Sequence, residues 1–273
     1  LAMATVFSMC VFASANEIEG SWWSLNMETG HLTVHCNVPY NDNVQDSELL
    51  RYIRYIKSVS FDEGVTAVNK NGFNRCSKIE RIELPKSLEF IGPWAFAGCA
   101  SLKEIVFPDN LNYIGYNSFA NCVSLESIVI PPRVTVVTEY AFYNCKSLES
   151  VEITNAKTAV DDYAFGKNNA LKTVKFPENA DIDPGTFKDS DNIEKVYYSG
   201  DEESYNELKI VKSPDNPFFF AEVFYNQPVA VYPVGFSVVS MPERLIYVLN
   251  EDVDLTGLEL EVEMTDGTVE KLS

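Results

Sequence analysis

One pattern of apolar positions repeats along more than half of the chain, from Lys57 to Tyr198. A phenylalanine closes each unit, and the spacing from one to the next is 23 residues, or 22 at the last step. An aliphatic residue follows six positions after each phenylalanine, and a β-branched residue follows three positions later. The phenylalanines are Phe73, Phe96, Phe119, Phe142, Phe165 and Phe187. A fixed period of this length predicts a solenoid, in which each coil buries its apolar edge against its neighbours.

Within one unit, the alternation of polar and apolar residues predicts a short strand. Glu104 and Val106 alternate with Ile105 and Phe107, so one face of a strand over these residues would be buried. Pro108 would end the strand because proline cannot donate a hydrogen bond to a ladder. An Ile-Gly pair that ends at Gly92 or Gly115, and an Ala-Phe pair further on, indicate a tight turn and a short helical turn.

These motifs resemble the BspA-like leucine-rich repeat family of bacterial surface proteins. The shared pattern is Leu-x-x-Ile-x-x-Pro, then Ile-Gly, then Ala-Phe-x-x-Cys, and the resemblance covers residues 31 to about 226. Two units depart from it: Val-Thr ending at Thr138 and Val-Asp ending at Asp161 replace Ile-Gly, and Thr154 replaces the proline. We expect looser or differently shaped turns in these two units.

The expected fold is mainly β with short helical turns: a leucine-rich repeat solenoid followed by a partial β-sandwich. Residues 57–198 form the repeats, and 16–56 and 199–227 are the caps that cover the open apolar ends. The N-terminal cap is expected to hold a strand near His31 and a helix near Ser47. The C-terminal cap is expected to hold a short helix after Ser199 and an edge strand. The apolar run beginning at Phe218 is expected to lie in the core.

Both ends of the chain differ from the repeats. Residues 1–15 carry no charge and end in Ala-Ser-Ala, which is typical of a secretory signal peptide that lacks its basic leader. A buried helix is one alternative, and a lipoprotein signal at Cys10 is another, which Met9 disfavours. Residues 228–273 alternate with period two and resemble part of a bacterial immunoglobulin-like module. The alternative is a β-hairpin appendage that is complete in itself.

Composition narrows the classes of partner. The chain has 273 residues, 46% of them hydrophobic, and a formal net charge of −19. This charge argues against nucleic acid and anionic membrane surfaces as partners. Beyond the leader, no apolar run is long enough to span a membrane. The composition fits a secreted or surface-attached protein.

The cysteines predict a structural column and no cofactor. Cys76, Cys99, Cys122 and Cys145 occupy one equivalent position in four successive units, and Asn168 continues the series, as does Ser190. Inward side chains stacked at one position do not converge on a point, as the ligands of a tetrahedral metal site must. We expect free thiols or small polar groups bonded to turn backbone. Disulfide bridges between adjacent coils are the alternative.

No set of residues indicates catalysis. The histidines, His31 and His35, precede Cys36 in a predicted strand, where they would lie roughly 13 Å apart, too far to share one metal ion. Paired carboxylates recur in the predicted loops, without the spacing of a 12-residue calcium loop, and solvated loop charge is the expected reading. They are Asp161, Asp162, Asp181, Asp183, Asp189 and Asp191. We expect no catalytic, metal or nucleotide site.

The outward residues of the repeat strands form the predicted binding surface, because solenoids of this kind dock partners on an extended concave sheet. Val106 and Val129 would form an apolar centre within a charged and polar surround. The full set is Arg81, Glu83, Glu104, Val106, Ser127, Val129, Ser150, Glu152, Thr173, Lys175 and Tyr197. Ordinary β-propensity on a solvated sheet would produce the same pattern.

The sequence therefore predicts a non-enzymatic binding or adhesion protein, secreted or on the cell surface. The family resemblance implies a protein or glycan partner on host or neighbouring cells. A structural surface scaffold and the recognition arm of a larger extracellular enzyme are the alternatives.

Overall fold

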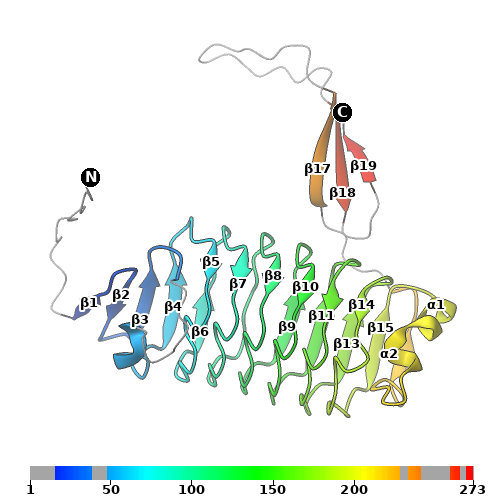
Figure 1. The fold of residues 1–273 in the computed structure, drawn as a ribbon, viewed down its shortest axis with the longest axis horizontal. Helices are drawn as coiled ribbons and strands as arrows, with labels where there is room; N and C mark the ends of the chain where they lie inside the picture. Colours follow the sequence, from blue (N-terminus) through cyan, green and yellow to red (C-terminus); the bar gives the residue numbers. More distant parts are fainter. Residues whose placement is uncertain (1–15, 39–47, 228–232, 241–258, 265–268, 273) are drawn as a thin grey trace, which may run out of the picture.

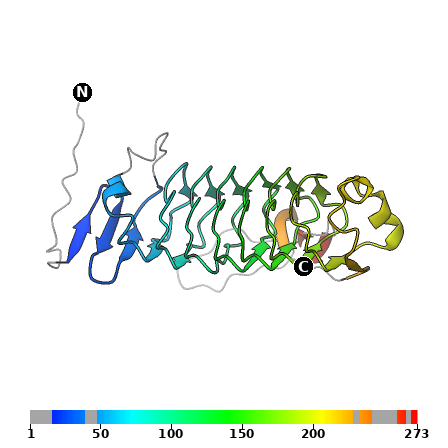
Figure 2. The same cartoon turned by 90° about the horizontal axis from the view of Figure 1, so that it is seen from below.

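The computed structural model describes residues 16–38, 48–227, 233–240, 259–264 and 269–272. Its main body is a β-solenoid in which parallel strands of successive coils pair edge to edge (Figures 1 and 2). Ser127 pairs with Ser150, and Val137 pairs with Val160, so corresponding residues are 23 positions apart. The predicted leucine-rich repeat solenoid is confirmed.

Each coil has two straight sides. The longer strands lie in two five-stranded sheets, and their residues alternate between outward and buried. These strands are β4 (Ser58–Phe61), β6 (Arg81–Glu83), β9 (Ser127–Ile130), β11 (Ser150–Ile153), β13 (Thr173–Phe176) and β15 (Lys195–Tyr198). Two-residue strands form a continuous six-stranded sheet on the other side: β5 (Ala67–Val68), β7 (Phe90–Ile91), β8 (Tyr113–Ile114), β10 (Val136–Val137), β12 (Ala159–Val160) and β14 (Asp181–Ile182).

The repeating phenylalanines stack in one internal row. Adjacent ring centroids are 5.2 to 5.6 Å apart and the ring planes are within 17° of parallel from Phe73 to Phe187. All six rings are buried. Stacked aromatic pairs contribute about 0.5–1.5 kcal/mol each beyond burial of their area, so the row couples each coil to the next.

The cysteine column bonds to the backbone of the preceding coil. Cys122 Sγ donates to Phe96 O over 3.3 Å, and the thiols of Cys99 and Cys145 do the same one coil before and after. Asn168 Nδ2 donates to Phe142 O over 3.1 Å, and Ser190 Oγ donates to Phe165 O over 2.9 Å. The four column cysteines are buried free thiols. One hydrogen-bonding position is thus filled by Cys, Asn or Ser.

The long-strand ladder breaks at the third coil. The segment 103–107, predicted as a strand, belongs to no sheet, and the two five-stranded sheets end at β6 and β9 on either side of it. Among the described residues, one backbone hydrogen bond links it to a neighbouring coil, from Glu126 N to Lys103 O. Phe107 packs edge-on against the rings of Phe119 and Phe142. Phe176 holds the equivalent position in the paired strand β13, so the size of the ring does not explain the break.

The break also opens the core slightly. Ile82, Ile105 and Phe107 are 6–8% exposed, whereas Val151 and Val174, which face inward further along, are 1% or less exposed. The alternation of buried and outward residues survives in this segment, although the strand does not.

The unusual turns keep the hydrogen bond to the preceding coil that the Ile-Gly turns make. Thr138 N and Asp161 N donate to the coil before them over 3.2 and 3.0 Å, as Gly115 N does over 2.9 Å. Thr154 Oγ1 adds a bond to Ile130 O. The bonds of Thr138 N and Asp161 N are slightly longer than the 2.7 and 2.9 Å of Gly92 N and Gly115 N, and the expectation of looser or differently shaped turns stays a prediction. A Cβ on Gly115 would lie 2.8 Å from backbone of the preceding coil, so close approach explains this glycine.

Positive φ angles occur elsewhere in the coil, at two positions per repeat. One position carries Trp94, Asn117, Tyr140 and Tyr163, and the other carries Gly98, Asn121, Asn144 and Lys167. Asparagine and glycine tolerate this region well, whereas bulky residues adopt it only when their surroundings hold them there.

Caps close both ends of the repeats. The N-terminal cap pairs β1 (Glu17–Glu19), β2 (Trp23–Asn26) and β3 (His31–Val34) with β4, and the helix expected near Ser47 is a single 3₁₀ turn, η2 (Glu48–Arg51). The C-terminal cap contains α1 (Glu202–Glu207), α2 (Lys209–Lys212) and the edge strand β16 (Glu222–Phe224). Asp201 caps α1 by accepting from Ser204 N.

Beyond the caps, β17 (Pro233–Ser240), β18 (Glu259–Met264) and β19 (Val269–Leu272) form a three-stranded antiparallel sheet. Residues 241–258 and 265–268 of the predicted module lie outside the described residues, as does the predicted signal peptide. The immunoglobulin-like module stays a prediction.

Candidate binding surface

The strand face, as we call it, is the outward side of β4, β6, segment 103–107, β9, β11, β13 and β15. The parallel register aligns its side chains in two rows across the coils. One row runs through Ser58, Arg81, Glu104, Ser127, Ser150, Thr173 and Lys195, and the other through Ser60, Glu83, Val106, Val129, Glu152, Lys175 and Tyr197. All eleven predicted contact residues therefore lie on one surface, and each is exposed or half-buried.

An apolar centre lies where the ladder breaks. Val106 is 80% exposed and Val129, one coil further on, is 51% exposed. A shallow pocket of about 420 Å³ lies beside Val106, between 81–84 and 104–108. Exposed aliphatic side chains are common singly. Here two lie on adjacent coils, and Val106 also lines the hollow beside the unpaired segment.

Charged residues surround this centre and pair locally. Arg81 and Glu83 form an ion pair of 2.8 Å with both side chains mostly exposed, so it contributes little stability. Lys175 and Glu152 form a half-buried pair of the same length. At the far end, Tyr197 stacks on Phe224 with ring centroids 4.8 Å apart. The face therefore changes from charged to apolar, back to charged and then to aromatic.

The two histidines are held separately in the N-terminal cap. His31 lies on the strand-face side of β3, and its ring nitrogens bond to Ser58 Oγ and Ser60 Oγ over 2.8 and 2.9 Å. The ring of His35 bonds to Asp62 and Ser24 over 2.9 Å. Within the described ranges, no group of three or more histidine, cysteine or acidic side chains is arranged to hold a metal ion.

The loop carboxylates separate into two places. Asp161, Asp162, Asp181 and Asp183 lie near the end of the short-strand sheet, and Asp181 pairs with Lys209 over 2.8 Å. Burial, and then repulsion by the neighbouring carboxylates, raises the pKa of Asp183. Burial and Glu139 raise the pKa of Asp161 in the same way. Asp189 and Asp191 line a different pocket, near the C-terminal cap.

An aromatic row on the turn side was missed by the sequence reasoning. Trp94, Tyr116, Tyr140 and Tyr163 are in contact from coil to coil, with centroid distances of 4.9 to 5.7 Å, and all are half-buried. The signal was available, since Trp94, Tyr140 and Tyr163 each stand two residues before a repeat phenylalanine. Their rings pack on one another, so we interpret the row as a second structural ladder.

The parallel coils, the ordered internal rows and the broad strand face define a leucine-rich repeat protein. The model of the BspA type leucine rich repeat region matches residues 46–149 and 95–208, with six copies. These matches span more than half of the sequence, and the chain belongs to this family.

Several solved bacterial structures are similar in outline. A leucine rich cell surface protein from Faecalibacterium prausnitzii A2-165 has 19% identity and a TM-score of 0.48, covering 68% of this chain and 55% of that one. The T. pallidum leucine rich repeat protein has 20% identity and the same TM-score, covering 70% and 93%. A leucine-rich repeat protein from Eubacterium ventriosum ATCC 27560 has 15% identity and a TM-score of 0.42, covering 77% and 83%. No curated protein matches the sequence.

In the described part of the chain, no helix has the length and apolar character needed to cross a membrane.

Proposed function

We propose that this protein is secreted or displayed on a cell surface, where it binds a protein or glycan partner through the strand face without catalysing a reaction. Family membership, the apolar leader at 1–15 and the strongly acidic composition support the location. The repeat architecture supports binding, because it presents an extended surface built from many coils.

The exposure of Val106 and Val129 carries this proposal. An apolar centre with a charged surround is the usual arrangement of a protein interface core and its rim. Val106 and Val129 lie in the middle of the strand face, with coils on either side to extend the contact. This layout favours a protein over a glycan as the partner.

The test compares two variants of the purified chain on host or neighbouring cells and on a glycan array. Val106→Asp with Val129→Asp places charge in the apolar centre and should abolish binding. Val136→Asp, on β10 of the opposite sheet, is the matched control and should bind normally. Circular dichroism checks that both variants fold. Undiminished binding of the double variant would reject the strand face.

A further inference from the structure

Two adjacent phenylalanines of the C-terminal cap point into water. Phe219 and Phe220, between α2 and β16, are 75% and 92% exposed, whereas Phe218 beside them is 3% exposed. The expectation that this apolar run lies in the core is therefore correct for Phe218 and wrong for the other two. Phe218 alone reaches the internal rings, and it contacts Phe176 and Phe187.

The exposed pair is large for a surface feature. The two rings touch at nearly right angles, with centroids 4.9 Å apart. Buried aromatic side chains each cover roughly 150–250 Å². A patch formed by two such rings reaches the size of the largest apolar patch on a typical soluble monomer, and that patch is often functional.

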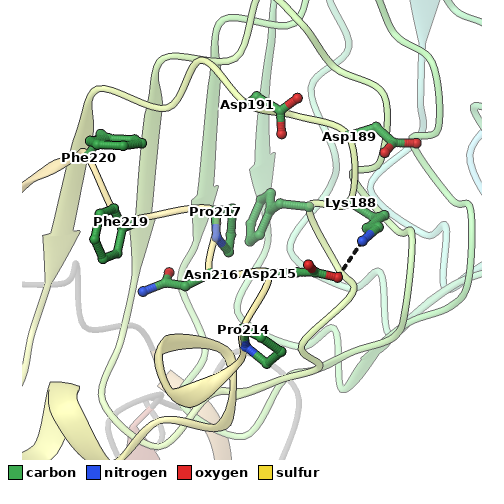
Figure 3. Close-up of a pocket in the computed structure, with 10 residues that line it drawn as sticks. Lys188, Asp189, Asp191, Pro214, Asp215, Asn216, Pro217, Phe219 and Phe220 are labelled. Carbon is green, nitrogen blue, oxygen red and sulfur yellow. Dashed lines mark hydrogen bonds and ion pairs between the residues drawn. The ribbon is translucent and has the colours of Figure 1, made fainter.

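A pocket of about 540 Å³ adjoins the two rings. Figure 3 shows Phe219 and Phe220 at one end of it and the carboxylates of Asp189 and Asp191 at the other. We call this the cap pocket; Lys188 and Asp215 also line it. The ammonium of Lys188 is engaged by the Asp215 carboxylate in an ion pair, whereas Asp189 and Asp191 make no ion pair with any described residue.

Charge favours a foreign, cationic occupant. The chain carries a net charge of −19, so a second copy would bring like charge to the cap pocket. The chain's own strands β18 and β19 are also acidic, with Glu259, Glu261, Glu263 and Glu270 against Lys271. Juxtaposed like charges are costly at interfaces, which disfavours both of these occupants.

Among cationic groups, the guanidinium of arginine matches this lining best. It is planar, so one guanidinium can stack on the rings at one end of the pocket, and its fixed fork of N–H donors lets a second arginine of the same segment pair with a carboxylate at the other end. A lysine ammonium is compact and strongly hydrated, so it gains less from the exposed rings. We propose that the cap pocket binds two arginine side chains presented by a basic, extended segment of a partner protein.

The test uses the full chain and a fluorescent octapeptide of alternating arginine and serine, with fluorescence polarisation as the readout. Matched peptides carry lysine or the neutral analogue citrulline in place of arginine. We expect the arginine peptide to bind most tightly, the lysine peptide more weakly and the citrulline peptide not at all. Equal binding of the arginine and citrulline peptides, or no binding of the arginine peptide at millimolar concentration, would overturn the proposal.

Variants locate the binding. Phe219→Ala with Phe220→Ala should weaken it about tenfold, since each cation–π contact at an exposed site contributes about two- to fivefold. Asp191→Asn should weaken it more than Asp109→Asn, which removes the same charge from an exposed residue of the third coil. Equal effects of Asp191→Asn and Asp109→Asn would mean that the peptide is attracted by overall charge, and would refute the site. Tight binding of a neutral oligosaccharide to the wild type, lost in the double alanine variant, would also refute the proposal.

This proposal is independent of the strand face. Val106→Asp with Val129→Asp should leave peptide binding unchanged, so the proposal for each surface can be refuted separately. The phenylalanine side chains are exposed, and their replacement should leave the thermal midpoint within a few degrees of the wild type.

Discussion

Raising the pH should unfold this protein through its cysteine column. Burial raises the pKa of the Cys76 and Cys122 thiols from 9.0 to about 12. The same cause raises the pKa of Cys99 and Cys145. Because the folded state keeps these protons while the unfolded state releases them near pH 9, stability is full below pH 9 and falls as the pH rises toward 12.

The size of the effect follows from these values. Between pH 8 and pH 10, ionisation of a thiol with a pKa of 9.0 stabilises the unfolded chain by about 1.4 kcal/mol, whereas the folded thiol hardly ionises. Cys76 and Cys122 together should therefore lower the free energy of unfolding by about 3 kcal/mol over this interval. Lysine and tyrosine groups that titrate in the same range contribute equally to the wild type and to a cysteine variant.

Urea unfolding at pH 8 and pH 10, under reducing conditions and followed by tryptophan fluorescence, measures the difference. The test variant is Cys76→Ser with Cys122→Ser. At position 122 a serine hydroxyl can still donate to Phe96 O, as the Ser190 hydroxyl does to Phe165 O. The double variant should lose about 3 kcal/mol less than the wild type between the two pH values. Cys36→Ser, at an exposed cysteine, is the control and should leave the pH dependence unchanged. An unaltered pH dependence in the double variant would refute the reasoning.

Three further predictions concern the repeats, each measured as the free energy of unfolding in urea. Ser118→Ala should raise it by about 1 kcal/mol, because the buried Ser118 hydroxyl has no hydrogen-bond partner among the described residues; a loss would contradict this. Asn168→Ala should lower the free energy of unfolding by about 1–3 kcal/mol, because Cys145 N loses its acceptor and two carbonyls lose a donor. Asn168→Ser should recover part of that loss, and equal losses in the two variants would contradict the role of the column. Phe119→Ala should lower the free energy of unfolding by about 3–5 kcal/mol, with Phe119→Leu costing clearly less, and a cost near zero would mean that the row does not couple the coils.

The sequence predicts the solenoid well because the same pattern of buried apolar positions recurs in every repeat. A phenylalanine every 23 residues fixes the length of a coil, and the register then places Ser127 opposite Ser150 with no further information. The outward position of Val129 follows from the same register. The repeat pattern is enough to predict the register, since similar units that stack on their neighbours leave few other arrangements of the coils.

The features that sequence reasoning missed depend on contacts between different units. The lost strand at 103–107 has no signal in its own repeat, since Phe107 occupies the position that Phe176 holds in the intact strand β13. The exposure of Phe219 and Phe220 depends on which one of three consecutive phenylalanines the cap can cover. In the C-terminal cap only one of the three side chains is buried, and hydrophobicity alone does not predict which one.

The interrupted ladder gives the solenoid a preferred line of opening. On the side of the longer strands, a single backbone hydrogen bond joins segment 103–107 to its described neighbours, whereas the six-stranded sheet behind it is unbroken. At this point, therefore, backbone pairing holds the two halves of the solenoid together mainly on the side of the six-stranded sheet. A pull that parts the ends should separate the coils first beside Val106, and would widen the very place where the apolar centre lies.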